Sequence, residues 1–245
     1  MTFQRDPEQN ETKHLRKFVD VAGKRVLEVG CGDGRLTWRY AADAAHVSGI
    51  DTDRDGLRVA MYDRPQDLET KVHFSEAPAE HLPFRAETFD IALLSWSLCC
   101  IEHEGMLDAL REIHRVLAPG GVWIDLRALS DPWHMEICSA REVLQTGSVS
   151  ELPHEPADDE AANQAASTAE SNGWFRRERE TLFPIYYVWD TPGEMEEWLE
   201  DEWENSVELN EETKRATRSA WAVSDGDSQV RMNVKMLITR WRKLK

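Results

Sequence analysis

The 245-residue chain is poor in cysteine, in basic residues and in long apolar runs. No uninterrupted hydrophobic stretch reaches the roughly 18 residues of a membrane-spanning helix, which excludes a transmembrane protein. Residues 1–14 lack the basic start and the apolar stretch of a secretory signal, so we expect a cytoplasmic protein. The four cysteines form no CxxC pair and no Cys/His spacing typical of zinc. They therefore predict neither a disulfide framework nor a metal site.

Positive charge is also scarce, because the chain has 29 Lys and Arg residues but 46 Asp and Glu residues. The resulting net charge of −17 repels phosphate backbones and anionic membrane surfaces. We therefore expect neither nucleic acid nor a membrane as a partner. The acidity is interpreted as favouring solubility or life at raised salt, with attraction of a cationic substrate as the alternative, and it carries no information about the fold. The oligomeric state does not follow from the sequence.

Short apolar runs alternate with helical patterns between residues 24 and 130. Each run is β-branched or alternating and is followed by a turn and a helix-like spacing, which is typical of parallel strands joined by helices. The expected strands lie at 25–30, 46–51, 71–76, 89–96 and 121–129. The pattern predicts an α/β, doubly wound, Rossmann-like sheet of seven strands, mostly parallel with an antiparallel edge strand, and helical insertions in the C-terminal half.

The chain after residue 130 has less regular patterns. A helix is expected from Pro156 to Gly173, where alanines form a stripe, and strands with a period of two are expected at 181–189 and 230–238. These two strands are predicted to pair antiparallel at one sheet edge. The remaining segments are read as a helix over 131–144, a loop over 146–156 and an acidic helical insertion over 193–212.

The first strand runs directly into Gly30-Cys31-Gly32-Asp33-Gly34, where missing side chains let the backbone turn sharply and approach a ligand. A dinucleotide fingerprint requires its third glycine at position 35, which is arginine, and no GxxxxGK[ST] phosphate loop occurs. Asp51 closes the second strand, where a carboxylate accepts hydrogen bonds from ribose hydroxyls. These features predict a nucleoside ligand without a pyrophosphate.

Several ordered motifs together resemble a known family. They are VLEVGCGDG at 26–34, Asp51 at the end of GID, LPF with TFD at 82–90, and RVLAPGG at 115–121. The chain over residues 24–127 resembles class I S-adenosylmethionine-dependent methyltransferases, and in particular the type 11 group, which includes methyltransferases of quinone biosynthesis. The resemblance implies a methyltransferase with S-adenosylmethionine as its cofactor and S-adenosylhomocysteine as the product.

The resemblance also implies a set of cofactor-binding residues. The glycine loop and Glu28 hold the methionine part, Asp51 the ribose, Thr52 and the 79–80 segment the adenine, and Ser95 the methionine amino group. The residues assigned in this way are Glu28, Gly30, Cys31, Gly32, Gly34, Asp51, Thr52, Ala79, Glu80 and Ser95. The alternative for Glu28 is an acidic strand residue that simply meets a backbone amide.

The chain departs from the family pattern at two places. Pro78 stands where relatives often carry Asp, and Leu98-Cys99-Cys100-Ile101 stands where many relatives carry one or two histidines. A role of that histidine therefore does not transfer to this chain. Cys99 and Cys100 are read as buried packing residues, with a thiophilic ligand such as trivalent arsenic as the alternative.

The acceptor is predicted to be a small molecule that receives the methyl group by in-line displacement. The side chains considered for its pocket are Trp96, His103, Trp133 and Tyr187, and no residue is assigned a catalytic role. The expected organisation is one methyltransferase domain over 1–245. It comprises a cofactor-binding core at 24–130, a variable lid and acceptor region at 131–228, and a final strand with a basic tail at 229–245. A sensor or partner subunit that binds the cofactor without catalysis, and another nucleoside-binding enzyme, are the alternative functions.

Overall fold

A computed structural model of the chain describes residues 3–149, 151–152, 155–201 and 207–245. The chain divides into two compact units. The glycine-loop unit comprises Thr12–Arg127, Ala157–Thr181 and Leu237–Lys245, and the antiparallel unit comprises Met1–Glu11, Ala128–Pro156 and Leu182–Met236. The expected organisation as a single domain with core, lid and tail stays a prediction.

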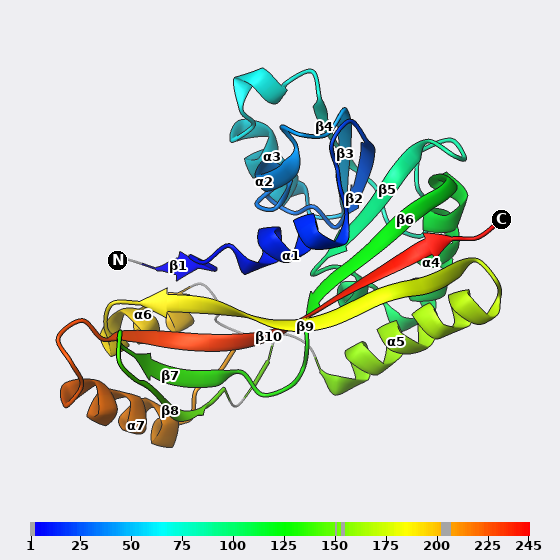
Figure 1. Cartoon of the computed structure of the whole chain (residues 1–245). Helices are drawn as coiled ribbons and strands as arrows, with labels where there is room; N and C mark the ends of the chain where they lie inside the picture. The colour runs from blue at the N-terminus through cyan, green and yellow to red at the C-terminus, as the bar shows by residue number, and fades with distance from the viewer. Residues whose placement is uncertain (1–2, 150, 153–154, 202–206) are drawn as a thin grey trace. The chain divides into compact units, whose positions relative to one another are not determined.

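The glycine-loop unit is built on a sheet in which the strands follow the order β4-β3-β2-β5-β6-β10-β9. Their bounds are β2 Arg25–Val29, β3 His46–Asp51, β4 Val72–Glu76, β5 Phe89–Ser95, β6 Leu117–Ala128, β9 Phe175–Trp189 and β10 Gln229–Lys243. The first five of these in spatial order pair in parallel. Figure 1 shows β9 and β10 running in opposite directions at the other edge. The predicted α/β, mostly parallel fold class with an antiparallel edge is confirmed.

Helices flank these strands because each presents an apolar stripe to the sheet. They are α1 Asn10–Phe18, α2 Thr37–Tyr40, α3 Arg54–Tyr62, α4 His103–Val116 and α5 Pro156–Ser171, with short 3-10 turns at η1 Gln66–Leu68 and η2 Leu98–Cys100. The alanine stripe of α5 is buried with Trp123 and Trp241, whose rings stack at 5.2 Å. The helix predicted from Pro156 to Gly173 is therefore confirmed.

The antiparallel unit contains a segment that the sequence analysis assigned wrongly. Residues 131–148 were expected to be helix and loop, but they form β7 His134–Cys138 and β8 Val143–Ser148. β7 pairs antiparallel with β10, and the carboxylate of Glu136 accepts hydrogen bonds from Arg231 (2.7 Å) and Asn233 (3.0 Å) on that strand. A buried glutamate fits a strand only with these partners, which lie about 95 residues further along the chain.

The sheet therefore has ten strands and not the expected seven, since β7, β8 and the short β1 (Gln4–Arg5) are added. The helices of the antiparallel unit are α6 Pro192–Asp201 and α7 Glu211–Ala222. α6 confirms the first part of the predicted acidic helical insertion, and residues 202–206 of that insertion lie outside the described residues. α7 was not predicted.

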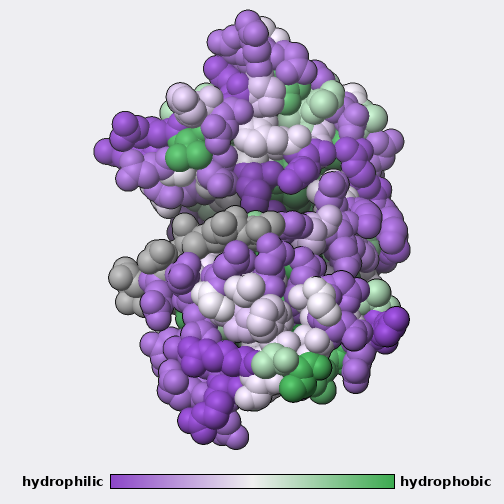
Figure 2. Space-filling model, turned by 90° about the vertical axis from the view of Figure 1, so that its left-hand side faces the viewer, coloured by the Kyte–Doolittle hydropathy of each residue, from purple (hydrophilic) through white to green (hydrophobic). Residues whose placement is uncertain are grey.

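No helix among the described residues is both long and apolar enough to cross a membrane. On the face drawn in Figure 2 hydrophilic side chains predominate, and the hydrophobic ones form small separate groups.

Candidate functional site

The glycine loop follows β2 at the carboxyl end of the parallel strands. Gly30, Gly32 and Gly34 have φ values of +75°, +51° and +77°, a region that favours glycine. The amides of Gly30 and Cys31 both donate to the carbonyl of Ile50 on β3, at 2.8 and 3.1 Å. These bonds fold the loop back against the end of the neighbouring strand.

Gly30 also meets a steric requirement, because a Cβ at this position would lie 2.2 Å from the Cβ of Ser97. The contact arises at the end of β5, where Trp96 has a φ of +59° and donates its amide to Leu126 (2.7 Å). The backbone bends at Trp96 and turns Ser97 toward β2. The Ser97 hydroxyl donates to the carbonyl of Val29 at 2.6 Å. A bulky residue with positive φ is strained, and such strain occurs preferentially at functional sites.

Asp51 connects the end of β3 to the glycine loop. Its Oδ2 accepts a hydrogen bond from the Gly32 amide at 2.7 Å, and its Oδ1 accepts one from the Asp53 amide at 2.8 Å. An ionised carboxylate offers about four lone-pair sites, so two of them remain for a ligand. The side chain is partly exposed at this edge of the sheet.

Glu28 lies beneath the loop and is almost completely buried. Its Oε2 accepts hydrogen bonds from the hydroxyls of Thr37 (2.5 Å) and Tyr40 (2.6 Å), which belong to α2. Burial raises the pKa of Glu28 to about 7, although the two hydrogen bonds lower it. Glu28 thus fastens β2 to the helix that follows the loop, and neither of these partners is a backbone amide.

The raised pKa of Glu28 predicts a pH-dependent stability. The folded-state pKa of about 7 exceeds the usual value of 4.5, so the stabilising contribution is complete below pH 4.5 and is lost as the pH rises through 7. We expect the free energy of unfolding of wild type, relative to Glu28→Gln, to fall by about 2.5 kcal/mol between pH 5 and pH 8. Urea unfolding of both proteins across this range measures the difference, and a constant difference would contradict the prediction.

Ser95 is the last residue of β5, next to the kink at Trp96. Its side chain is 7% exposed, and its hydroxyl oxygen has no hydrogen-bond partner among the described residues. A buried hydroxyl in this state is uncommon in folded proteins and calls for an explanation.

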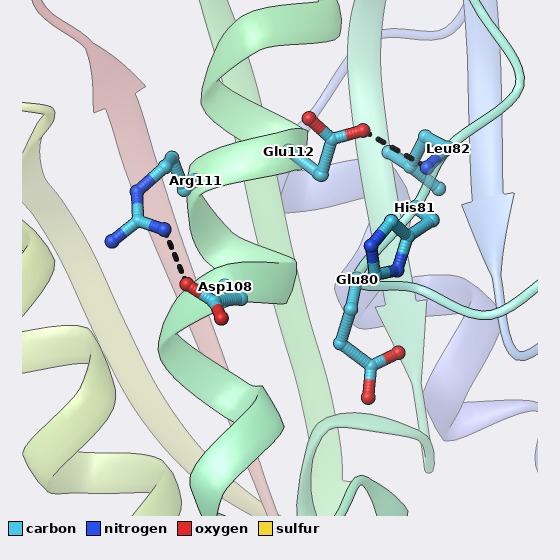
Figure 3. Close-up of a pocket in the computed structure, with 6 residues that line it drawn as sticks. All are labelled: Glu80, His81, Leu82, Asp108, Arg111 and Glu112. Atoms are coloured by element: carbon cyan, nitrogen blue, oxygen red, sulfur yellow. Dashed lines mark hydrogen bonds and ion pairs between the residues drawn. The ribbon is translucent and has the colours of Figure 1, made fainter.

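The remaining cofactor candidates take two different positions. Thr52 is exposed directly after Asp51. Ala79 and Glu80 are half-buried, and the carboxylate of Glu80 lies against Gly105 on α4. Glu80 lines a hollow of about 410 Å³ beside α4 together with His81, Leu82, Asp108, Arg111 and Glu112. Figure 3 shows how these six side chains lie.

The cysteines near the site are free thiols. Cys31 is buried in the glycine loop, and burial together with the charges of Glu28 and Asp51 raises the pKa of its thiol. Cys99 and Cys100 lie on η2, where Cys99 is buried as predicted but Cys100 is exposed, so the prediction of a buried residue is wrong for Cys100. The Cys100 thiol donates to the carbonyl of Trp96 at 3.2 Å. The hydrogen bond between the two thiols raises the pKa of Cys99 and lowers that of Cys100.

The four acceptor-pocket candidates belong to different units. In the glycine-loop unit, Trp96 is half-buried, and Nε2 of the exposed His103 at the start of α4 is hydrogen-bonded to Asp158 Oδ1 of α5 at 2.8 Å. In the antiparallel unit, Trp133 and Tyr187 are fully buried and their rings meet edge to face at 6.3 Å. Their assignment to an acceptor pocket stays a prediction.

Several polar residues at this edge of the sheet were not predicted from the sequence. Ser97 gave no signal because its partner Val29 lies 68 residues away in the sequence. Thr37 and Tyr40 gave none because they meet Glu28 only once α2 folds against β2. Asp125 and Arg127 did give a signal in the sequence, since these two charged residues alternate with apolar ones in a predicted buried strand.

Comparison with known proteins supports the motif assignments. Residues 26–121 match the family described as "Methyltransferase domain". Methyltransferase GfsG of Streptomyces halstedii is 39% identical over 114 residues, which are 45% of this chain and 40% of that protein. The ubiquinone/menaquinone biosynthesis C-methyltransferase UbiE of Vibrio campbellii is 36% identical over 104 residues, which are 40% and 39% of the two chains. The chain thus covers about two fifths of the length of these relatives.

Two solved structures show the same fold over nearly the whole chain. A methyltransferase-like protein from Bacillus halodurans has a TM-score of 0.62 at 17% identity, and the alignment covers 96% of this chain and 99% of that protein. The [4+2]-cyclase SpnF has a TM-score of 0.60 at 20% identity, and the alignment covers 96% of this chain and 80% of that protein. At such identities the likeness shows the fold alone. The resemblance to class I, type 11 methyltransferases is confirmed by the matched segment.

Proposed function

We propose that this chain, which carries a methyltransferase domain at residues 26–121, transfers the methyl group of S-adenosylmethionine to a small-molecule acceptor. The observation that carries the proposal is the junction of three strand ends. There a glycine loop, the Asp51 carboxylate and the unpartnered Ser95 hydroxyl lie at the carboxyl edge of one parallel sheet. Ligands of open α/β sheets bind at this edge.

The residues present fit the cofactor that the family implies. The two free acceptor sites of Asp51 suit a pair of ribose hydroxyls, and the Ser95 hydroxyl suits the methionine amino group. The glycine loop leaves its backbone open to the methionine part of the cofactor because it has no side chains at three positions. We assign the adenine to Thr52 and the 79–80 segment, as predicted from the sequence.

Glu28 takes a different role in this proposal from the one expected. Oε2 of its carboxylate accepts the hydrogen bonds from both Thr37 and Tyr40, so we assign Glu28 the task of holding the loop on α2. Cys31 contributes its backbone, since its thiol is buried. The residues proposed to contact the cofactor are therefore Gly30, Cys31, Gly32, Gly34, Asp51, Thr52, Ala79, Glu80 and Ser95.

When bound, the sulfonium cofactor supplies an already activated methyl group. The chain therefore needs to position both partners and to exclude water, and it needs no covalent nucleophile. The contacts at this edge of the sheet hold the strand ends that position the cofactor. The Trp96 amide joins β5 to β6, and Ser97 joins β5 to β2 through its hydrogen bond to Val29 and its close packing on Gly30. A location in the cytoplasm stays the prediction made from the sequence.

The acceptor does not follow from the relatives, because their names span different reactions. One is a malonyl-[acyl-carrier protein] O-methyltransferase, 36% identical over 98 residues, and another is a C-methyltransferase of quinone biosynthesis. The proposal is therefore limited to a small-molecule acceptor.

Calorimetric titration of the full chain with S-adenosylmethionine and S-adenosylhomocysteine tests the proposal, with NAD as the negative control. We expect micromolar binding of both sulfur compounds and none of NAD. Formation of S-adenosylhomocysteine against a metabolite panel then separates an enzyme from a binding subunit. Absence of binding to either sulfur compound would overturn the proposal.

A further inference from the structure

The chain that follows β4 passes beside Asp51. The amide of Ala77, the first residue after this strand, donates to the Asp51 carbonyl at 3.1 Å. Next comes Pro78, which has no amide hydrogen, and then the half-buried Ala79 and Glu80. Within the described part of the chain, the amides of Ala79 and Glu80 donate to no acceptor. Two neighbouring backbone donors are therefore available close to the residue assigned to the ribose.

These two amides belong to a loop that has no regular structure of its own. Residues 77–88 form neither helix nor strand, and the hydrogen bond from the His81 amide to the Pro78 carbonyl, at 3.3 Å, is a long one. A ligand-binding group on a loop is placed precisely only if neighbouring rigid elements support the loop. The contacts of the 77–88 loop with such elements therefore decide where its amides lie.

Helix α4 supplies these contacts through Glu112 and Arg115. Glu112 Oε2 accepts a hydrogen bond from the Leu82 amide at 2.9 Å, which Figure 3 shows as a dashed line. Arg115 donates to the carbonyls of Leu82 (3.0 Å) and Phe84 (2.7 Å). The two side chains are also joined to each other, from Nε to Oε1 and from Nη2 to Oε2, both at 2.7 Å. Together they bind three backbone groups of the loop.

The chemistry of this pair suits it to fixing a backbone. The Arg115 guanidinium holds the pKa of the Glu112 carboxyl below its usual range, so the carboxylate is charged at neutral pH and accepts from both partners. A planar guanidinium with several donors fixes direction as well as distance. The side chains are 21% and 37% exposed, and an ion pair in such a position contributes little to stability by itself. Its bonds to the loop are the more important contribution.

Glu80 provides a second contact between the loop and α4. A Cβ at Gly105, in the first turn of the helix, would lie 2.5 Å from Glu80 Oε1. The N-cap residue of α4, Glu102, makes no side-chain capping bond, and a carboxylate near a helix N-terminus is favourable. The loop is thus held on α4 at its first turn and again two turns later, at Glu112.

We propose that Glu112 and Arg115 are positioning residues for the adenine base, because they hold the loop at the place where the Ala79 and Glu80 amides meet it. This inference rests on the proposed function and adds two residues that do not themselves touch the cofactor. Amide donors select a base edge that accepts hydrogen bonds. Adenine offers an acceptor at N1, whereas N1 of hypoxanthine carries a hydrogen, and a site built for one pattern rejects the other.

Calorimetric titration of the full chain with S-adenosylhomocysteine and S-inosylhomocysteine tests the inference, since the two compounds differ only in the base. Wild type should bind the adenosyl compound at least tenfold more tightly. Arg115→Met removes the bonds to Leu82 and Phe84 and should reduce this preference at least fivefold, through weaker binding of the adenosyl compound. A general loss of stability would weaken both compounds equally and leave their ratio unchanged.

Arg111→Met is the matched control, because this exposed arginine of the same helix pairs with Asp108 and lies over the Trp174 ring. It should leave both affinities within twofold of wild type. Glu112→Gln, which keeps the shape and removes the charge, serves as a second variant if Arg115→Met fails to fold, and should reduce the preference at least twofold. Failure of wild type to bind S-adenosylhomocysteine would overturn the proposed function. Intact binding without a base preference, or with a preference that both variants retain, would overturn the positioning role alone.

Discussion

Replacing Gly30 with alanine is expected to abolish binding of S-adenosylhomocysteine and to lower the melting temperature. The new Cβ would lie 2.2 Å from the Cβ of Ser97, and the φ of +75° is unfavourable for any residue with a Cβ. Positive φ costs about 1–2 kcal/mol, and overpacking of this kind adds about 1–3 kcal/mol. The sum of about 2–5 kcal/mol corresponds to a decrease in Tm of about 5–15 °C for a chain of this size.

Gly23 offers a matched control, because its φ is +67° but a Cβ there would meet nothing within 4 Å. Gly23→Ala should therefore show only the conformational cost and retain full cofactor binding. Removing the opposing Cβ in the double variant Gly30→Ala/Ser97→Gly should restore part of the Tm. Equal Tm values for Gly30→Ala and Gly23→Ala would show that the close approach to Ser97 does not constrain the loop.

Asp51→Ala should weaken binding of S-adenosylhomocysteine by a factor of 100 or more while the chain stays folded. A hydrogen bond to a charged group contributes about 1.5–3 kcal/mol, so losing two bonds to the ribose accounts for about 3–6 kcal/mol. The variant also removes the acceptors of the Gly32 and Asp53 amides, which loosens the loop. Calorimetric titration measures the change directly.

Asp53→Ala is the control for the effect of Asp51 on local structure. The Asp53 side chain accepts a hydrogen bond from the Asp55 amide and caps α3, so its loss should cost about 1 kcal/mol of stability. It has no proposed contact with the ligand, and cofactor affinity should remain within about threefold of wild type. A similarly small loss in Asp51→Ala would contradict the assignment of Asp51 to the ribose.

The outline of the glycine-loop unit could be predicted because its signals are local. Each parallel strand is a short apolar run, and the α5 alanine stripe identifies its buried face within 16 residues. The same holds for Gly30 and Asp51, which sequence spacing places at the ends of adjacent strands. Local periodicity is sufficient wherever the residues that decide an element lie within it.

The wrongly assigned segment at 131–148 shows where local signals fail. β7 carries Glu136 in its centre, and only Arg231 and Asn233 on β10 make its burial tolerable. The role that we propose for Glu28 in holding the loop on α2 also has no signal in the sequence, since its hydroxyl partners are supplied by the fold of α2 against β2. Residues that need a distant partner cannot be assigned before that partner is known.

The sequence by itself determined the fold class, the methyltransferase resemblance and the positions of the glycine loop and Asp51, because hydrophobic period and glycine spacing act over a few residues. The tertiary structure alone decided the contact of Ser97 with Gly30, the burial of the Ser95 hydroxyl and the buried ion pairs of Arg127 with Asp125 and Asp159. These features depend on which side chains become neighbours when distant strands pair, and burial then sets the cost of every unsatisfied polar atom.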